Sequence, residues 1–261
     1  MNSATPHLVA IPAGTVVLRD ARTGTSRDAT LRPFNIGRTT VTRAQFAAAA
    51  GPEACPQIPA HAVTWFEAVR WCNEASALAG LAPAYEIRGR EVRWDVAAEG
   101  FRLPTEAEWE WACRAGTSGP AYGPLANIAW TAADQVDGPQ EVGGKVPNDF
   151  GVFDMIGNIW EWCWDYADTA RYADYRSIRG GGWADPEWSC RASVRRGSAP
   201  DAVLEDVGFR VARGAVGEVG SQTAQGWSAA ADLSRAEFHG PRPPGWTPLR
   251  GDRTPPATLN S

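Results

Sequence analysis

GFRLPTEAEWEWACRAG, residues 100–116, carries the clearest local signal of structure in the chain. Thr105 is followed three residues later by Glu108, the pattern of a capping box, in which two side chains satisfy the first free N–H groups of a helix. Apolar residues then recur at helical spacing, namely Trp109, Ala112 and Cys113. Gly116 can close such a helix in a left-handed conformation. The stretch therefore predicts a helix with an acidic first turn, where the helix dipole favours carboxylates.

The same start signal occurs twice more, at Thr42 with Gln45 and at Thr64 with Glu67. Apolar residues at helical spacing follow the second of these, namely Trp65, Phe66, Val69, Trp71 and Cys72. Strand-like alternation is found in VAIPAG, TVVLRD, SIRGG and VGFRVAR, and YEIRGREVRWD is typical of a hairpin that turns near Gly89. Few regular elements separated by long, tryptophan-rich loops predict an α+β domain.

Composition excludes several classes of protein. Hydrophobic residues make up 44% and charged residues 21% of the 261 residues, which is typical of a globular chain. The net charge of −5 and the lack of a Lys/Arg-rich stripe argue against a nucleic-acid partner. No apolar run approaches the roughly 20 residues that span a bilayer, so we expect no membrane association. The N-terminal residues lack the pattern of a signal peptide, which favours a cytoplasmic location.

Cysteine and histidine are too scattered to predict a metal centre from spacing alone. The five cysteines form no CxxC pair, and an odd number in a cytoplasmic protein favours reduced thiols. Cys72 and Cys113 lie within helical apolar patterns and are expected to be small buried hydrophobes. The three histidines lie far apart, so a histidine-rich metal centre is not expected.

The composition changes at Gly214, where glycine, proline, serine and alanine become frequent. We therefore divide the chain into a domain at residues 1–213 and a C-terminal arm at residues 214–261. Trp227, Phe238 and Trp246 are costly to leave in water. The arm is thus expected to pack on the domain or on a neighbouring subunit, and in the second case it would build a homo-oligomer.

Four motifs together carry a resemblance to a known family: GFRLPTEAEWEWACRAG at 100–116, PNDFGVFDMIGNIWEWCWD at 147–165, IRGGGW at 178–183 and VGFRVAR at 207–213. The chain resembles the formylglycine-generating enzymes, also called sulfatase-modifying factors, over about residues 8–213. The resemblance implies the fold of that family, which is related to C-type lectins and supports long structured loops on limited regular structure.

The resemblance also implies a structural calcium ion in DMIGNIWEW. By position, its ligands would be the side chains of Asp154 and Glu161 and the carbonyls of Gly157 and Ile159, and such oxygen ligands suit a hard cation. The alternative is that the polar side chains only satisfy N–H groups of the turn. A second calcium site of the family would begin at Asn127 and Ile128, but its remaining ligands cannot be placed.

The family's oxidases carry two cysteines five positions apart in the glycine-rich loop, and the pair binds copper(I). Here the second position is Cys190, the first is Asp185, and Gly182 replaces a serine of the oxidases. A hard carboxylate cannot replace a soft thiolate on copper(I), so formylglycine generation is not expected. Two interpretations of Cys190 stay open: a thiolate activated by the adjacent Arg191, or a buried packing residue.

The loop at residues 183–196 combines aromatic rings with both signs of charge, which suits a polar ligand or a peptide. Candidate catalytic residues are Cys190, Asp185 and Glu187, and candidate ligand-binding residues are Trp183, Trp188, Arg191 and Arg195. A structural alternative for Trp183 is that it turns into the core.

Two functions follow from this sequence. The first is an oxidoreductase that modifies a peptide or a small molecule other than a sulfatase, with a catalytic metal that the sequence does not identify. The second is a non-catalytic module that binds a ligand through the same loop. Fold alone cannot separate an enzyme from a binding protein.

Overall fold

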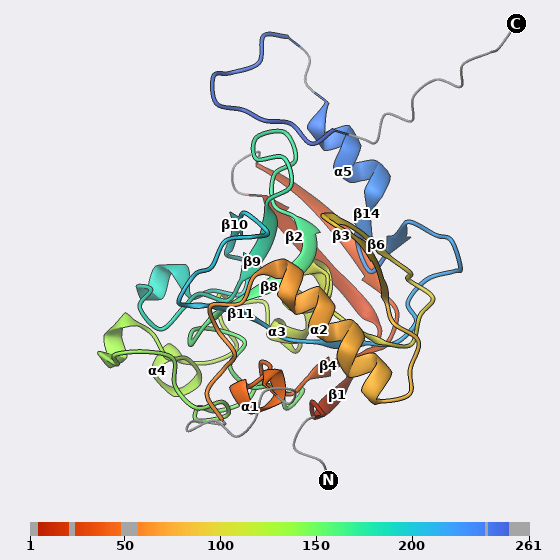
Figure 1. The fold of residues 1–261 in the computed structure, drawn as a ribbon. Coiled ribbons are helices and arrows are strands. Elements are labelled where there is room, and N and C mark those ends of the chain that lie inside the picture. The colour runs from red at the N-terminus through yellow and green to blue at the C-terminus, as the bar shows by residue number, and fades with distance from the viewer. Residues whose placement is uncertain (1–4, 21–23, 48–56, 238–239, 251–261) are drawn as a thin grey trace, which may run out of the picture.

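The computed structural model describes residues 5–20, 24–47, 57–237 and 240–250 (Figure 1). In chain order its elements are β1 (Leu8–Ile11), β2 (Gly14–Asp20), β3 (Thr25–Leu31), β4 (Phe34–Gly37), α1 (Arg43–Phe46), α2 (Trp65–Leu78), β5 (Tyr85–Arg88), β6 (Glu91–Trp94), β7 (Phe101–Arg102), α3 (Glu106–Arg114), α4 (Leu125–Ile128), the 3₁₀ helix η1 (Ala132–Asp134), β8 (Trp160–Tyr166), β9 (Arg176–Arg179), the 3₁₀ helix η2 (Glu187–Ser189), β10 (Arg195–Ser198), β11 (Val207–Phe209), β12 (Ala212–Arg213), β13 (Thr223–Ala224), β14 (Trp227–Ser228) and α5 (Ala229–Ala236). The α+β prediction is confirmed: short helices and strands are joined by long structured loops.

Two four-stranded sheets form the centre of the molecule. One has the order β1-β4-β12-β7 and the other β10-β9-β8-β11. Every pairing in them is antiparallel except that of β11 with β8, which is parallel. Three hairpins complete the strands: β2–β3, β5–β6 and β13–β14. The predicted hairpin turn at Gly89 is confirmed, since this glycine has φ +61° between β5 and β6.

Strand β8 runs through the core. Its residues from Trp160 to Asp165 are all buried, so the strand packs on both faces. The indole N–H of Trp162 donates to the carbonyl of Val63 at 2.8 Å, and the carbonyl of Cys163 accepts from the indole of Trp65 at 3.0 Å. These two indoles bury a large apolar area while their N–H groups stay hydrogen-bonded, which fixes α2 against the sheet.

All three predicted capping boxes are present, at Thr42, Thr64 and Thr105. Helix α3 begins after Thr105 and ends in a left-handed conformation, as predicted. The first residue in that conformation is Ala115, with φ 43°, and Gly116 follows with φ +89°. A backbone N–H of Ala115 still donates to the carbonyl of Trp111, so the helix end is satisfied.

Helix α3 buries three glutamates, each beside a guanidinium from another element. Arg102 pairs with Glu108 at 2.6 Å, Arg179 lies 2.5 Å from Glu110, and Arg195 lies 2.7 Å from Glu106. Charges this deep are stable only when they are paired. These pairs tie α3 to β7, β9 and β10 and place Glu106 where β8 ends.

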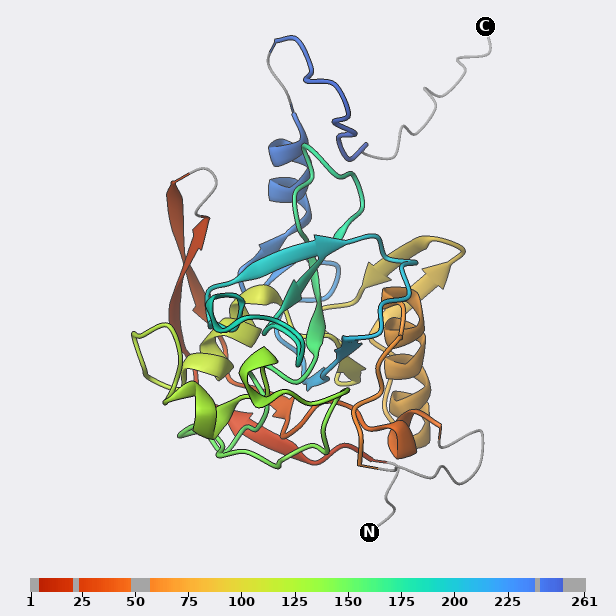
Figure 2. The same ribbon diagram turned by 90° about the vertical axis from the view of Figure 1, so that its left-hand side faces the viewer.

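The C-terminal arm packs against the domain of its own chain. Trp227 is 8% exposed, and its ring lies 5.5 Å from those of both Trp94 and Trp164. Further along, the ring of Trp246 stacks on the guanidinium of Arg171 at 4.7 Å. Phe238 lies outside the described residues. Helix α5 stands on the same side of the body as the β2–β3 hairpin (Figures 1 and 2).

No helix among the described residues is long and apolar enough to cross a membrane.

Candidate functional site

The loop at residues 183–196 follows β9, contains the short helix η2 and runs into the first two residues of β10. At its base, the carboxylate of Asp185 accepts hydrogen bonds from the indole N–H of Trp160 at 2.6 Å and from the amide of Gly182 at 2.9 Å. Its other oxygen pairs with Arg196 at 3.2 Å, and that guanidinium lies 4.7 Å above the Trp160 ring. Asp185 is therefore the centre of a closed polar network that holds the loop against β8.

Cys190 lies beside this network. The residue is fully buried, and burial first, followed by the charge of Asp185, raises the pKa of its thiol to about 12. A thiol in this state is protonated at neutral pH, whereas nucleophiles and metal ligands are thiolates. Gly181 packs so closely that a Cβ there would lie 2.7 Å from the sulfur, which explains the glycine. The geometry favours the packing interpretation of Cys190.

Three predicted residues of this loop face solvent. Glu187 and Arg191 are exposed, and Trp188 is 65% exposed, with its carbonyl accepting from Arg191 Nε at 2.7 Å. An indole this exposed is unusual for a side chain that buries 150 Å² or more when packed. Trp183 is half-buried, and its indole N–H is buried without a hydrogen-bond partner among the described residues.

Arg195 turns away from the other predicted ligand-binding residues. It donates from Nε and Nη2 to the two carboxylate oxygens of Glu106, at 2.8 and 2.7 Å. Its neighbour Arg196 faces Asp185 instead, because successive residues of a strand point to opposite faces of the sheet. The structure thus divides the predicted site: Asp185, the buried Cys190 and the exposed Trp188 lie on one side of β10, and the side chain of Arg195 lies on the other.

The predicted calcium turn is a tight polar turn whose glutamate already has a cationic partner. Both oxygens of Glu161 accept from Arg210, at 2.8 and 3.0 Å, and one also accepts from Trp109 Nε1 at 2.8 Å. Asp154 accepts from the amide of Gly143 at 2.7 Å, while its second oxygen has no partner among the described residues. Asp154 therefore fits a hard cation, and Glu161 fits one only in part.

At the second predicted calcium position, both backbone carbonyls already accept hydrogen bonds. The carbonyl of Asn127 accepts from the amide of Val146 at 2.9 Å, and that of Ile128 accepts from the hydroxyl of Tyr122 at 3.3 Å. The ammonium of Lys145 lies beside them, 2.8 Å from the carbonyl of Ala126. It also pairs with Asp134 at 2.9 Å and lies 4.1 Å from the Trp130 ring centroid. The ammonium group of Lys145 thus supplies a positive charge beside the carbonyls of Asn127 and Ile128. Within the described ranges, no three His, Cys, Asp or Glu side chains are arranged to hold a metal ion.

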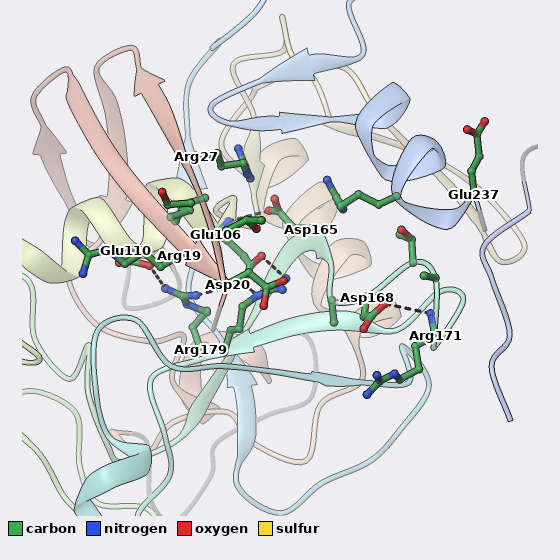
Figure 3. A pocket seen from close by; sticks show the side chains of 18 of the residues that line it. Arg19, Asp20, Arg27, Glu106, Glu110, Asp165, Asp168, Arg171, Arg179 and Glu237 are labelled. Carbon is green, nitrogen blue, oxygen red and sulfur yellow. Dashed lines mark hydrogen bonds and ion pairs between the residues drawn. The ribbon is translucent and has the colours of Figure 1, made fainter. Parts of the chain in front are cut away.

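A cavity of about 560 Å³ lies on the side of Arg195, between the β2–β3 hairpin, the start of α3, the end of β8 and the arm (Figure 3). Its arginines are Arg19, Arg27, Arg171, Arg179, Arg195 and Arg235. Its carboxylate residues are Asp20, Glu106, Glu110, Asp165, Asp168 and Glu237. Of these residues, only Arg195 was predicted from the sequence as part of a site. The buried acidic start of α3 was the available signal, but nothing local shows that the hairpin and the arm close over it.

Comparison with known proteins identifies the family. The sulfatase-modifying factor enzyme 1-like domain matches residues 1–215, most of the chain. The chain belongs to the sulfatase-modifying factor family. This confirms the resemblance carried by the four motifs, and it confirms the fold.

Relatives of this chain in the sulfatase-modifying factor family include proteins named as formylglycine-generating enzymes and proteins named as inactive. The chain is 33% identical over 153 residues to inactive C-alpha-formylglycine-generating enzyme 2 of Bos taurus, covering 51% of this chain and 50% of that protein. It is 28% identical over 249 residues to the formylglycine-generating enzyme of Streptomyces coelicolor, covering 71% and 79%. Among solved structures, Treponema denticola variable protein 1 superposes with a TM-score of 0.71 at 27% identity, covering 79% of this chain and 94% of that one.

Proposed function

We propose that this member of the sulfatase-modifying factor family is a ligand-binding module and not a copper-dependent oxidase. The observation that carries the proposal is the network around Asp185. This residue stands where the oxidases have their first cysteine, and its carboxylate is bonded to Trp160, Gly182 and Arg196. The remaining thiol, Cys190, is buried and protonated. Neither side chain offers the soft, ionised sulfur that binds copper(I).

The exposed part of the same loop supports a binding role. Trp188 is 65% exposed on a loop whose base is fixed by the Asp185 network, and Glu187 and Arg191 flank it with opposite charges. A rigid aromatic side chain between charged neighbours is the composition of a binding hot spot, and it suits a peptide or protein segment. One relative of this chain is named inactive C-alpha-formylglycine-generating enzyme 2. The name indicates that a protein of this family can lack the oxidase activity.

The other function predicted from the sequence, an oxidoreductase acting on a different peptide or small molecule, depends on Asp185, Glu187 and Cys190 as reacting groups. The structure brings Asp185 and Cys190 together but leaves Glu187 exposed at the surface. A raised thiol pKa works against nucleophilic or redox use of Cys190, because the thiolate is the reactive form. The binding function is therefore the better supported of the two.

A copper(I) titration tests the proposal directly. The reduced protein is titrated against a competing copper(I) chelator, with Cys190→Ser and Asp185→Cys as variants. We expect no tight binding by the wild type or by Cys190→Ser, and a gain of one-to-one binding by Asp185→Cys, which rebuilds the family's cysteine pair. Tight wild-type binding that disappears in Cys190→Ser would instead support the oxidase.

A peptide selection tests the binding role itself. Peptides selected from a displayed library against the wild-type protein should lose affinity by more than about tenfold in Trp188→Ala, since truncating a hot-spot residue costs about 2 kcal/mol or more. The melting temperature should change little, because Trp188 is exposed. Val219→Ala is the matched control, an 87% exposed apolar residue in the arm. Equal losses in both variants, or none in either, would contradict this role for the loop.

A further inference from the structure

The charged cavity is built in part by residues that lie outside the family domain. The family match ends at residue 215, whereas Arg235, Glu237 and Trp246 of the arm line the cavity. Its floor comes from α3 and β8, and the β2–β3 hairpin forms another wall (Figure 3). The residues of the Asp185 network do not line the cavity, and the cavity volume of about 560 Å³ lies within the roughly 300–1,000 Å³ range of small-molecule sites.

Most charges at the floor cancel within the protein. Glu106 lies between Arg195 at 2.7 Å and Arg179 at 3.3 Å, and Arg179 also pairs with Glu110. Asp165 differs from these glutamates. It accepts one hydrogen bond, from the backbone amide of Glu106 at 2.8 Å, and no lysine or arginine of the described residues forms an ion pair with it. One carboxyl at the floor therefore has no ion-pair partner among the described residues.

Asp165 is also deeply placed, with only 4% of its surface exposed. Burial first, and then the charge of Glu106, raises the pKa of its carboxyl to about 7. The charged groups that act on it come from five elements or their ends: Glu106 on α3, Asp232 on α5, Arg27 on β3, Arg176 on β9 and Arg195 on β10. A cation that enters the cavity would favour the ionised form of this carboxyl, because no ion pair within the described part of the chain does so.

Three further polar groups of the cavity residues lack a protein partner. The hydroxyl of Thr169 and the Nε atoms of Arg171 and Arg179 are buried without a hydrogen bond among the described residues. Thr169 itself is 1% exposed. Buried polar atoms are normally bonded, and exceptions near a cavity point to a missing water or ligand.

We propose that this cavity binds a small organic cation, an amine or a guanidine, whose charged group pairs with the carboxylate of Asp165. Ion pairing between a guanidinium or ammonium and a desolvated carboxylate is among the stronger polar contacts in proteins. The hydroxyl of Thr169 is available to accept a further hydrogen bond from the ligand. Among the described residues, Arg195 alone of the range 183–196 lines this cavity, and the test of the binding loop does not alter it, so either proposal can fail without the other.

Isothermal titration with agmatine, which carries both an ammonium and a guanidinium, tests the proposal on the full chain. We expect one-to-one binding at pH 8. The cation binds the ionised carboxyl, so affinity should fall by about tenfold or more at pH 5, where Asp165 holds its proton. At pH 7, binding should release about half a proton, measurable by comparing buffers of different ionisation enthalpy.

Three variants and one anion complete the experiment. Asp165→Asn should lose agmatine binding and proton release together, and Thr169→Val should weaken binding while the protein stays folded, because its hydroxyl has no partner to lose. Asp149→Asn, which removes an exposed carboxylate outside the cavity, is the control and should bind normally. Should Asp165→Asn not fold, the pH dependence and proton release of the wild type still decide the matter. No agmatine binding up to millimolar concentration, binding that does not depend on pH, or tighter binding of butyrate would overturn the proposal.

Discussion

Glu106 and Asp165 lie in contact and show how neighbouring carboxyl groups come to differ. Burial acts to raise the pKa of Glu106, but Arg195 and Arg179 lower it to about 2, so this residue is ionised. Asp165 is buried to a similar extent, has no ion pair among the described residues, and has its pKa raised to about 7. Burial acts to raise the pKa of both carboxyls, so the difference between them comes from the guanidinium groups that pair with Glu106 and not with Asp165.

This difference predicts an unusual pH dependence of stability. An acid whose folded pKa lies above its unfolded value of about 4 binds more protons when folded, so its contribution to stability is lost as pH rises from about 4 to about 7. We expect the free energy of unfolding of the wild type to fall across this window relative to that of Asp165→Asn. Urea unfolding at pH 5 and pH 8 measures the difference. Parallel pH profiles for the two proteins would show that Asp165 is ionised throughout.

Among the elements, the turn from Asp154 to Glu161 shows how a loop is fixed without regular structure. Asp154, Gly157 and Asn158 all have positive φ values. At Gly157 a side chain is also impossible on steric grounds, because a Cβ would lie 2.3 Å from the carbonyl oxygen of Trp130. The turn therefore locks the segment around Trp130 to the start of β8, and its polar side chains converge as a consequence.

We propose that a calcium ion, where present, stabilises this turn through Asp154. Ligands that bind only the folded state raise its stability, so a calcium chelator should lower the melting temperature. A loss of about 1 kcal/mol corresponds to about 2–4 °C for a chain of this size. Asp154→Asn should remove the response to the chelator. Asp134→Asn is the control and should keep the response, because the carboxylate of Asp134 pairs with Lys145 and not with the proposed calcium ion. Identical wild-type melts with and without chelator would contradict a bound calcium ion.

Considered as a whole, the domain and the arm share one core. Trp227 packs on Trp94 and Trp164, and its indole N–H donates to the buried carboxylate of Asp232 at 2.8 Å. Thr105, the cap of α3, donates through its hydroxyl to the carbonyl of Gln225 in the arm. The arm thus completes its own domain, and a homo-oligomer built through the arm stays a prediction.

Removing this contact should affect the entire molecule. Trp227→Ala should lower the free energy of unfolding by about 3–5 kcal/mol, as expected for truncation of a buried tryptophan. The domain and arm should still unfold in a single transition, followed by denaturant titration with fluorescence and circular dichroism. Leu233→Ala, a truncation on the 41% exposed part of α5, is the matched control and should cost little. Separate transitions for the arm and the domain would show that they do not share a core.

Local patterns in the sequence predicted several of the helices and strands, and the four motifs together predicted the family. The capping boxes at Thr42, Thr64 and Thr105 and the hairpin at Gly89 depend on residues only a few positions apart, so local patterns predict them. The replacement of the first cysteine by Asp185 was also visible in the sequence, once the four motifs had indicated the family, and it predicts a changed site in the loop that follows β9.

Only the tertiary structure decided which groups act together. The carboxylate of Asp185 meets Trp160 from 25 positions away, and Arg195 meets Glu106 from 89 positions away, so no local pattern reports either contact. The predicted loop is divided because the side chains of Arg195 and Arg196 point to opposite faces of β10. The cavity forms because the arm folds back over α3 and β8. Burial and pairing also set the ionisation of Cys190, Glu106 and Asp165, because desolvation and nearby charge exist only once the chain is folded.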